Sequence, residues 1–334
     1  MSDRISSEDL NPDRYKQDRR RFLIQGCAAW GVASCGDSTN WPRALGASAT
    51  SAQAYSQSVS SDNQTETKIC VFTKPFQELE FAQLAELLSK WPVSGVEATV
   101  RVGGQIEPAA TAEQLPKMHE ILLAKERAYM ILATDITGAD HPDIQRVLEV
   151  AAKLGIVYFR MGYFQYKKDQ PVLPQLDVFA KRSRELATVC GQLGMTALYQ
   201  NHAGSDYVGA PIWDLVQILQ EIPKEQIAVA LDIRHATIES TTAWPLAYSS
   251  IRDHIGAIFV KDAVVERDKV RDVPLGHGHQ ARSLFQRLRA DDIQGPLSLH
   301  MEHIDHRDPA LLSNRIEATA RDISTLREWI ADMG

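Results

Sequence analysis

Residues 227–235 read IAVALDIRH, an unbroken apolar run that ends abruptly in acidic, basic and imidazole side chains. Apolar runs without polar alternation are typical of strands in a parallel sheet that helices cover on both faces. The same arrangement recurs in ALYQNH (197–202), AIFVKD (257–262) and LSLHME (297–302). We therefore interpret each run as a buried strand whose carboxyl end carries polar groups.

Eight runs of this kind follow Lys68, and segments with helical periodicity separate them. The predicted strands cover residues 69–73, 95–100, 129–134, 157–161, 196–200, 227–232, 257–261 and 297–301. The predicted helices include residues 81–90, 142–154, 177–193, 212–222 and 311–333. Eight strand–helix units in about 260 residues predict an α/β protein with a (β/α)8 barrel. A doubly wound open sheet is the structural alternative, although no nucleotide-binding glycine motif follows the first strand.

The first 66 residues predict a targeting segment rather than a fold. Three arginines at 19–21 precede a short apolar stretch, as in a twin-arginine export signal. We assign this signal to residues 1–36, with a possible lipobox that ends at Cys35, and a flexible polar linker to residues 37–66. An ordinary signal-peptidase site at 47–49 is the alternative cleavage site. The barrel is then expected to occupy residues 67–334.

Export would place the protein in the periplasm or anchor it to a membrane as a lipoprotein. A chance arginine cluster in a disordered tail is the alternative interpretation. The apolar stretch is well short of the roughly 20 residues that span a bilayer, so no transmembrane span is expected. The net charge of -7 predicts no nucleic-acid partner. The spacing of the four cysteines supports neither a zinc site nor a disulfide scaffold.

Polar side chains gather where the predicted strands end. In a β/α barrel these positions face a common mouth, which is where the active sites of such barrels lie. Unpaired charged groups are not tolerated in a core, so these side chains form either a site or a solvated rim, and their regular recurrence favours a site. They include Glu97, Arg101, Arg160, Gln200, Asn201, His202, Asp232, Arg234, His235, Lys261, His300 and Glu302.

Six segments resemble those of one branch of a known superfamily. They read GVEATVR (95–101), YQNH (199–202), DIRHA (232–236), VKD (260–262), PLG (274–276) and LHME (299–302). On these segments the chain resembles the xylose-isomerase-like TIM barrels, the sugar phosphate isomerases and epimerases, from about residue 68 to its end. The resemblance implies a small-molecule sugar or sugar derivative as the binding partner and leaves the oligomeric state open.

The resemblance also implies a divalent ion, namely Mn²⁺, Mg²⁺ or Co²⁺, that polarises the substrate carbonyl and hydroxyl. In the superfamily, Glu, Asp, His and Glu ligate this ion, and the two glutamates also move the proton next to the carbonyl. Asp232 and Glu302 match that set, whereas the other glutamate falls on Gln200 and the histidine on Phe259. An amide oxygen can ligate but is no general base, and phenylalanine cannot ligate.

Three alternatives could complete or replace this incomplete set of metal ligands. His202 or His235 could join the ligands, His277 could reach the mouth, or the charge of Lys261 could replace that of the metal. A buried lysine can also act as an acid or base. We therefore expect the metal ligands to be Gln200, His202, Asp232 and Glu302. The catalytic groups are expected to be Glu302, Lys261 and His235.

The remaining polar residues at the mouth are expected to bind substrate. They are Glu97, Arg101, Arg160, Asn201, Arg234 and His300. Structural alternatives stay open: an ion pair of Glu302 with Arg160 or Arg234, a hydrogen bond between Asp232 and His235, and a rim pair of Glu97 with Arg101. Lys261 beside Asp262 could equally be a surface lysine.

The favoured function is a carbohydrate isomerase or epimerase that moves a proton beside a carbonyl group. A lyase or hydrolase acting on a keto- or phospho-sugar is an alternative, because the fold does not determine the reaction. A non-catalytic sugar-binding barrel is the third possibility. An endonuclease is the least favoured, because the chain is acidic and lacks a multi-histidine set for three metals.

Overall fold

The computed structural model of the protein describes residues 67–267, 269–278 and 281–332. The expected signal region at 1–36, its lipobox at Cys35 and the linker at 37–66 lie outside the described residues. Within the described ranges, no helix is both long enough and apolar enough to cross a membrane. The described ranges fall within the segment that was predicted to form the barrel.

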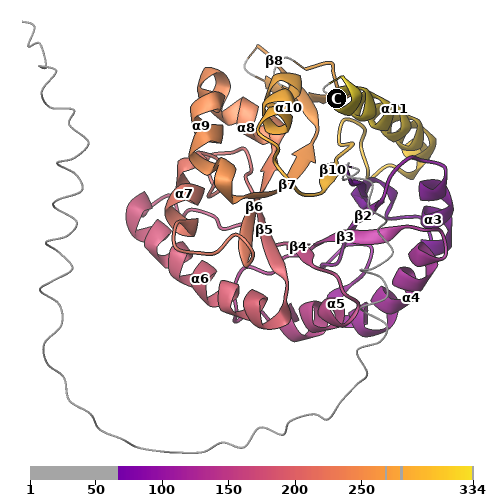
Figure 1. Ribbon diagram of the computed structural model, residues 1–334, viewed down its shortest axis with the longest axis horizontal. Helices are drawn as coiled ribbons and strands as arrows, with labels where there is room; N and C mark the ends of the chain where they lie inside the picture. Colours follow the sequence, from indigo (N-terminus) through magenta and orange to yellow (C-terminus); the bar gives the residue numbers. More distant parts are fainter. Residues whose placement is uncertain (1–66, 268, 279–280, 333–334) are drawn as a thin grey trace, which may run out of the picture. The chain divides into compact units, whose positions relative to one another are not determined.

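Eight parallel strands close into a barrel in the order β1-β10-β7-β6-β5-β4-β3-β2 (Figure 1). The pairing of β1 with β10 completes the ring, and the predicted (β/α)8 barrel is confirmed. The strand residues are almost all buried, as enclosed parallel strands should be. The barrel strands are β1 (Ile69–Phe72), β2 (Gly95–Thr99), β3 (Ala128–Ala133), β4 (Tyr158–Arg160), β5 (Thr196–Gln200), β6 (Ile227–Asp232), β7 (Ile255–Val260) and β10 (Leu297–Leu299).

Helices surround the barrel on its outer side (Figure 1). The predicted helices at 81–90 and 311–333 agree closely with the structure, whereas the helix predicted at 142–154 begins with a π-helical turn at Ile144–Leu148. The helix predicted at 177–193 starts earlier, directly after Pro171. The helices are α3 (Phe81–Ser89), α4 (Thr111–Leu123), α5 (Glu149–Lys153), α6 (Val172–Leu193), α7 (Trp213–Leu219), α8 (Ile233–Ser240), α9 (Trp244–Ile251), α10 (Ala281–Ala290) and α11 (Leu312–Ala331).

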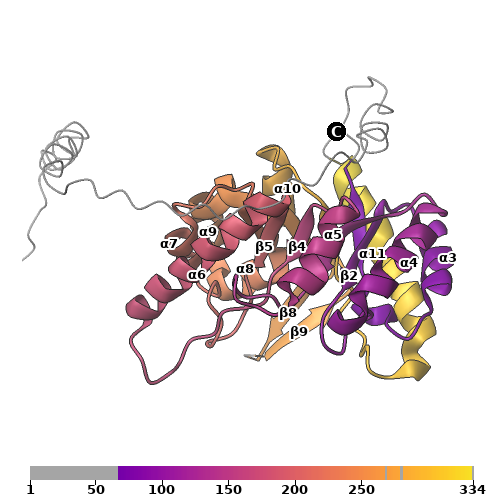
Figure 2. The ribbon, with the colours of Figure 1, turned by 90° about the horizontal axis from the view of Figure 1, so that it is seen from below.

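A β-hairpin that was not predicted follows the seventh barrel strand. It pairs β8 (Asp262–Glu266) with β9 (Lys269–Val273) in antiparallel register and extends away from the barrel (Figure 2). Its outer half is exposed, so its residues lack the continuous apolar pattern that identifies the barrel strands. The hairpin matters for function because its last residues return to the mouth of the barrel.

The inside of the barrel is packed with apolar side chains. These are Cys70, Ile131, Leu198, Ala228, Ala230, Ala257 and Phe259. The Phe259 ring lies 4.6 Å from the His300 ring, centroid to centroid, and so forms part of the floor under the polar residues. The position where the resemblance implied a metal-ligating histidine is therefore occupied by an apolar packing residue.

Arg315 ties the first and last loops of the mouth together. This residue of α11 has a fully buried side chain, and its guanidinium donates to the backbone oxygens of Pro75, Asp305 and Asp308 at 2.6–3.0 Å. It also pairs with Glu78. Because Pro75 follows β1 and the two aspartates follow β10, one buried cation orders two loops that are far apart in sequence.

We expect Arg315→Met to lower the free energy of unfolding by about 3 kcal/mol, because buried carbonyl groups lose their donors. Arg321→Met, on an exposed part of the same helix, is the matched control and should change stability little. Urea denaturation followed by circular dichroism measures both. Equal stability of the two variants would show that Arg315 does not order the loops.

Candidate active site

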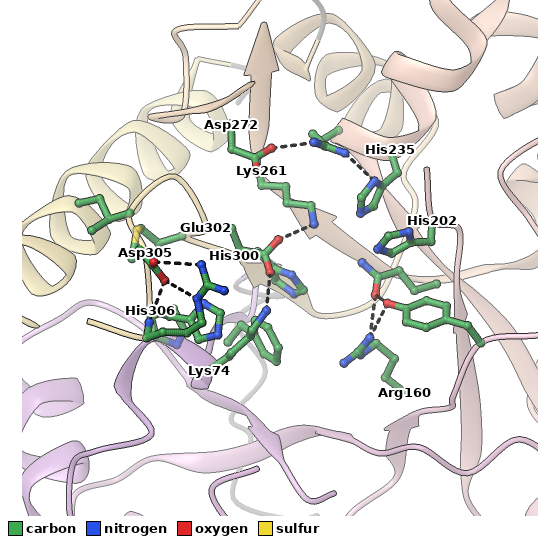
Figure 3. A pocket seen from close by; sticks show the side chains of 18 of the residues that line it. Lys74, Arg160, His202, His235, Lys261, Asp272, His300, Glu302, Asp305 and His306 are labelled. Atoms are coloured by element: carbon green, nitrogen blue, oxygen red, sulfur yellow. Dashed lines mark hydrogen bonds and ion pairs between the residues drawn. The ribbon is translucent and has the colours of Figure 1, made fainter. Parts of the chain in front are cut away.

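A cavity of about 570 Å³ opens at the carboxyl ends of the barrel strands (Figure 3). Most of the predicted mouth residues line it, which are Arg101, Arg160, Gln200, His202, Arg234, His235, Lys261, His300 and Glu302. Glu97, Asn201 and Asp232 do not line the cavity and lie one layer below it, with at most 1% of each residue exposed. The convergence of strand ends on one site is therefore observed.

Lys261 lies at the centre of the site between two carboxylates. Its Nζ is 2.6 Å from Glu302 Oε2 and 3.2 Å from Asp232 Oδ2, and its side chain is only 8% exposed. Burial acts to lower the pKa of Lys261, but the attraction of the two carboxylates outweighs burial and raises the pKa above 10.5. Lys261 is therefore a permanent cation, and the alternative of a surface lysine paired with Asp262 is excluded.

Glu302 is the carboxylate that faces the cavity. Its side chain is 24% exposed, and its second oxygen lies 3.8 Å from Lys74 Nζ. Burial acts to raise the pKa of Glu302, but Lys261 and the other nearby cations hold it well below its usual value of 4.5. Glu302 is thus ionised at neutral pH and accessible to a ligand.

The Asp232 carboxylate is fully engaged inside the protein. Oδ2 accepts from Gln200 Nε2 at 2.7 Å and forms the ion pair with Lys261, and Oδ1 accepts from the backbone N–H of His235 in the first turn of α8. The Asn201 side chain fixes the Asp232 backbone from both sides, as acceptor at 2.7 Å and donor at 3.2 Å. Asn201 thus positions Asp232 and does not reach a substrate, contrary to expectation.

The Gln200 oxygen is also occupied. It accepts from Arg160 Nη1 at 2.9 Å and from the Tyr163 hydroxyl at 2.5 Å. Arg160 in turn forms an ion pair with Glu97, Nε to Oε1, at 3.2 Å. The oxygen through which Gln200 was expected to ligate a metal therefore points at two donors, one of them a cation.

Glu97 is buried in the barrel and belongs to the support of the site. Its Oε2 accepts from the Ser298 hydroxyl at 2.6 Å and contacts His300 Nε2 at 2.8 Å. Burial acts to raise the pKa of Glu97, but His300, Arg160 and Ser298 together lower it. The expected contact of Glu97 with substrate, and its alternative as a rim partner of Arg101, are both corrected by this placement. It lies two residues before the end of β2 and faces inward.

The side chains present do not fit a divalent cation. Among the described residues, no three or more His, Cys, Asp or Glu side chains are grouped so that they could hold a metal ion. The Lys261 ammonium already lies between Asp232 and Glu302, and Gln200 is bound to Arg160. A cation placed here would meet a permanent positive charge, so the expected set of Gln200, His202, Asp232 and Glu302 does not assemble as ligands.

Two of the histidines that line the cavity, His202 and His235, are neutral and have different tautomers. His235 Nδ1 lies 3.0 Å from Arg234 Nη1, and because a guanidinium only donates, Nε2 carries the proton. His202 Nδ1 lies 2.8 Å from the backbone oxygen of Ala203, so its Nε2 is an unprotonated acceptor. Burial lowers both pKa values, that of His235 strongly, with a further contribution from Lys261. His202 is therefore the better proton acceptor, whereas His235 carries its proton on Nε2, and the catalytic role of His235 stays a prediction.

Several site residues were missed by the sequence analysis. Lys74 follows β1, Tyr163 follows β4, and Asp272 arrives from the unpredicted hairpin and binds Arg234 at 2.9 Å. The motif after the first strand, TKPF at 73–76, was a usable signal for Lys74. His277 is exposed and does not line the cavity, so it does not supply the missing metal ligand.

Comparison with known families supports the barrel fold that the strand order shows. The model of the xylose isomerase-like TIM barrel family matches residues 134–329. The chain belongs to this family. Among curated proteins, no sequence matches the chain.

Several solved structures share the fold of this chain at low sequence identity. The 3-keto-D-glucoside 4-epimerase from E. coli is 16% identical, with a TM-score of 0.58, over 78% of this chain and 100% of that one. A probable 3-DHS dehydratase from Bacillus anthracis is 14% identical, with a TM-score of 0.59, over 76% and 98%. The D-allulose 3-epimerase from Methylomonas sp., solved with D-allulose, is 13% identical, with a TM-score of 0.58, over 78% and 97%.

We expect Lys261→Met to lower the free energy of unfolding at pH 7 by about 3 kcal/mol, because Asp232 and Glu302 lose their shared cation. In the wild type this contribution is complete below pH 10.5, the usual lysine pKa, and is lost only as the pH rises through the raised pKa. In the variant, Glu302 loses the cation that most strongly lowers its pKa, and burial then acts to raise that pKa, so the deficit should shrink as the medium is acidified. Urea titrations from pH 4 to 9 measure this, with exposed Lys153→Met as the control. A constant deficit, or none, would contradict the arrangement.

Proposed function

We propose that the protein is a carbohydrate isomerase or epimerase that transfers a proton at the carbon beside a carbonyl group. The observation that carries this proposal is the Lys261 ammonium at the floor of the cavity between Asp232 and Glu302. An ammonium has three N–H groups; one donates to Glu302, and Asp232 lies within ion-pair distance of the nitrogen. Because Lys261 also lines the cavity, we infer that a remaining N–H can reach a substrate oxygen. Structural neighbours that act on sugars as epimerases support the choice of reaction.

Lys261 would act on the carbonyl oxygen. When a proton leaves the adjacent carbon, negative charge develops on that oxygen, and a fixed cation in a poorly solvated site stabilises it. The raised pKa of Lys261 keeps the cation in place at neutral pH. In this proposal the lysine supplies the charge that a divalent ion was expected to supply, and Asp232 and Gln200 hold the lysine in position.

Glu302 and His202 would exchange the proton. Glu302 is ionised, faces the cavity and lies beside Lys261, so its carboxylate can accept the proton from carbon. His202 lines the same cavity, and its unprotonated Nε2 can accept a second proton. One carboxylate, Glu302, and one imidazole, His202, would together take over the role of the two glutamates implied by the resemblance.

We expect Mn²⁺, Mg²⁺ and Co²⁺ to be dispensable. After dialysis against EDTA, turnover should stay within about twofold of the untreated enzyme, because no step needs Lewis-acid charge beyond that of Lys261. Metal analysis of the purified protein is the companion measurement. One equivalent of tightly bound divalent ion, with activity that depends on it, would overturn the role given to Lys261.

We expect solvent deuterium to enter substrate carbon without bond cleavage when the enzyme meets its sugar in D₂O. Proton NMR of a panel of ketoses, aldoses and keto-glycosides detects this exchange. Glu302→Gln should slow it by about 10²–10⁴-fold, the usual contribution of a positioned base. Exposed Glu328→Gln is the matched control and should exchange as the wild type does. A Glu302→Gln enzyme with full activity would exclude Glu302 as the base.

A lyase is the second candidate, and the structural similarity to a probable 3-DHS dehydratase favours it over a hydrolase. The same groups suffice, because removal of a proton beside a carbonyl also starts the elimination of a neighbouring hydroxyl as water. The NMR experiment separates the two reactions. Loss of the signal of the proton on the carbon that carried the hydroxyl, with the appearance of an alkene proton, would identify the lyase. Binding with neither change would identify a non-catalytic sugar-binding barrel.

We further propose that the enzyme works outside the cytoplasm, either in the periplasm or as a lipoprotein anchored at Cys35. The paired arginines at 19–21 and the apolar stretch after them support this location. An exported enzyme would meet sugars from the surroundings of the cell.

A further inference from the structure

Two cations at the mouth have no hydrogen-bonded partner among the residues that the structure describes. Lys74 and Arg101 line the cavity, and within the described part of the chain each has only a distant ion pair. Lys74 Nζ lies 3.8 Å from Glu302 Oε1, and Arg101 Nη1 lies 3.9 Å from Asp135 Oδ1. The other lysine and arginine side chains of the cavity are bound more closely: Lys261 by Glu302, Arg234 by Asp272, Arg307 by Asp305 and Arg160 by Gln200.

The two acids near this pair are poorly suited to neutralise it. Glu302 already accepts from Lys261 at 2.6 Å, and the Asp135 side chain is 54% exposed to solvent. Lys74 and Arg101 are themselves largely covered, with 29% and 23% of their side chains exposed. Burial lowers the pKa of each, and nearby like charges, including Arg101 acting on Lys74, lower them further. Two cations in a shielded cavity are best stabilised by an anion between them.

We propose that the sugar bound in this cavity carries a negatively charged group, a carboxylate or a phosphate, and that Lys74 and Arg101 bind it. This inference rests on the proposed function, because it assigns a charge to the substrate of that reaction. A guanidinium offers two parallel N–H donors to such a group, and the ammonium adds a movable third donor. Neither residue is required for the proton transfer itself.

The position of Glu302 limits where the charged group sits on the sugar. Lys74 and Lys261 approach the two oxygens of this one carboxylate (Figure 3). The anion at Lys74 and the carbonyl oxygen at Lys261 would therefore lie on either side of Glu302. They would be separated by about the width of its carboxylate and the two ammonium groups. We infer that the anionic group and the reacting carbon belong to the same monosaccharide unit and not to a distant part of a chain.

Isothermal titration calorimetry of the full-length protein tests this with three probes: D-glucuronate, D-glucose 6-phosphate and neutral D-glucose. At low salt we expect at least one anionic probe to bind at least tenfold more tightly than D-glucose. We expect Lys74→Met and Arg101→Gln each to weaken that probe by about 10–100-fold, as for a lost charge-assisted hydrogen bond. Binding should also weaken with added salt. The better of the two anionic probes distinguishes a carboxylate site from a phosphate site.

Matched controls separate the site from general charge effects. Exposed Lys153→Met and Arg184→Gln remove the same charges elsewhere and should leave binding unchanged. Lys74→Arg keeps the charge and should retain most of the affinity, and the circular dichroism spectrum of Lys74→Met should match that of the wild type, which shows that the weakly binding variant is folded. Equal binding of all three probes, or unchanged anion binding in both Lys74→Met and Arg101→Gln, would overturn the proposal.

The outcomes for this inference and for the proposed function are distinguishable. Tight binding of an anionic probe, sensitive to both variants, without deuterium exchange on any sugar would leave the anion site standing and overturn the isomerase. Deuterium exchange on neutral sugars only, with no preference for anions, would overturn the anion site and leave the isomerase standing.

Discussion

The whole site depends on one ammonium group that is shared by two carboxylates. Lys261 lies where neighbouring strands bring Asp232 and Glu302 together. Removing it would leave the buried Asp232 with hydrogen bonds from Gln200 and the His235 backbone only, and Glu302 with the more distant Lys74 as its cation. This constraint explains why Gln200 is an amide. A third carboxylate at that position would add a further charge beside Asp232, whereas the amide donates to Asp232 and accepts from Arg160.

The fold was predictable because its signal is local. Each barrel strand is a short run of buried residues, and such a run can be recognised without knowledge of its neighbours. The hairpin of β8 and β9 lacks this signal, because half of it is exposed and its strands are not continuous buried runs. Its pairing also depends on the turn, so it was missed. The ends of the strands also located the cavity correctly, because the barrel geometry brings them to one side.

The roles of individual residues were less predictable because they depend on contacts between strands. Glu97 and Asn201 stand at or near strand ends, yet their side chains turn to buried partners instead of the cavity. The expectation for Gln200, that its oxygen would ligate a metal, failed because Arg160 and Tyr163 take that oxygen. Lys74 was overlooked because its proposed role depends on its having no close hydrogen-bonded partner among the described residues. Such an absence can be recognised only in the structure.

The buried guanidinium of Arg315 has a consequence for the order in which the protein matures. It joins a backbone oxygen of Pro75 to a helix 240 positions later in the chain, so a long loop must close before the first segment of the mouth is held. During synthesis, the amino-terminal strands emerge long before this clamp exists. A nascent or truncated chain would thus possess many of the binding groups without their final alignment, and ligand recognition would begin only once the carboxyl-terminal helix has docked.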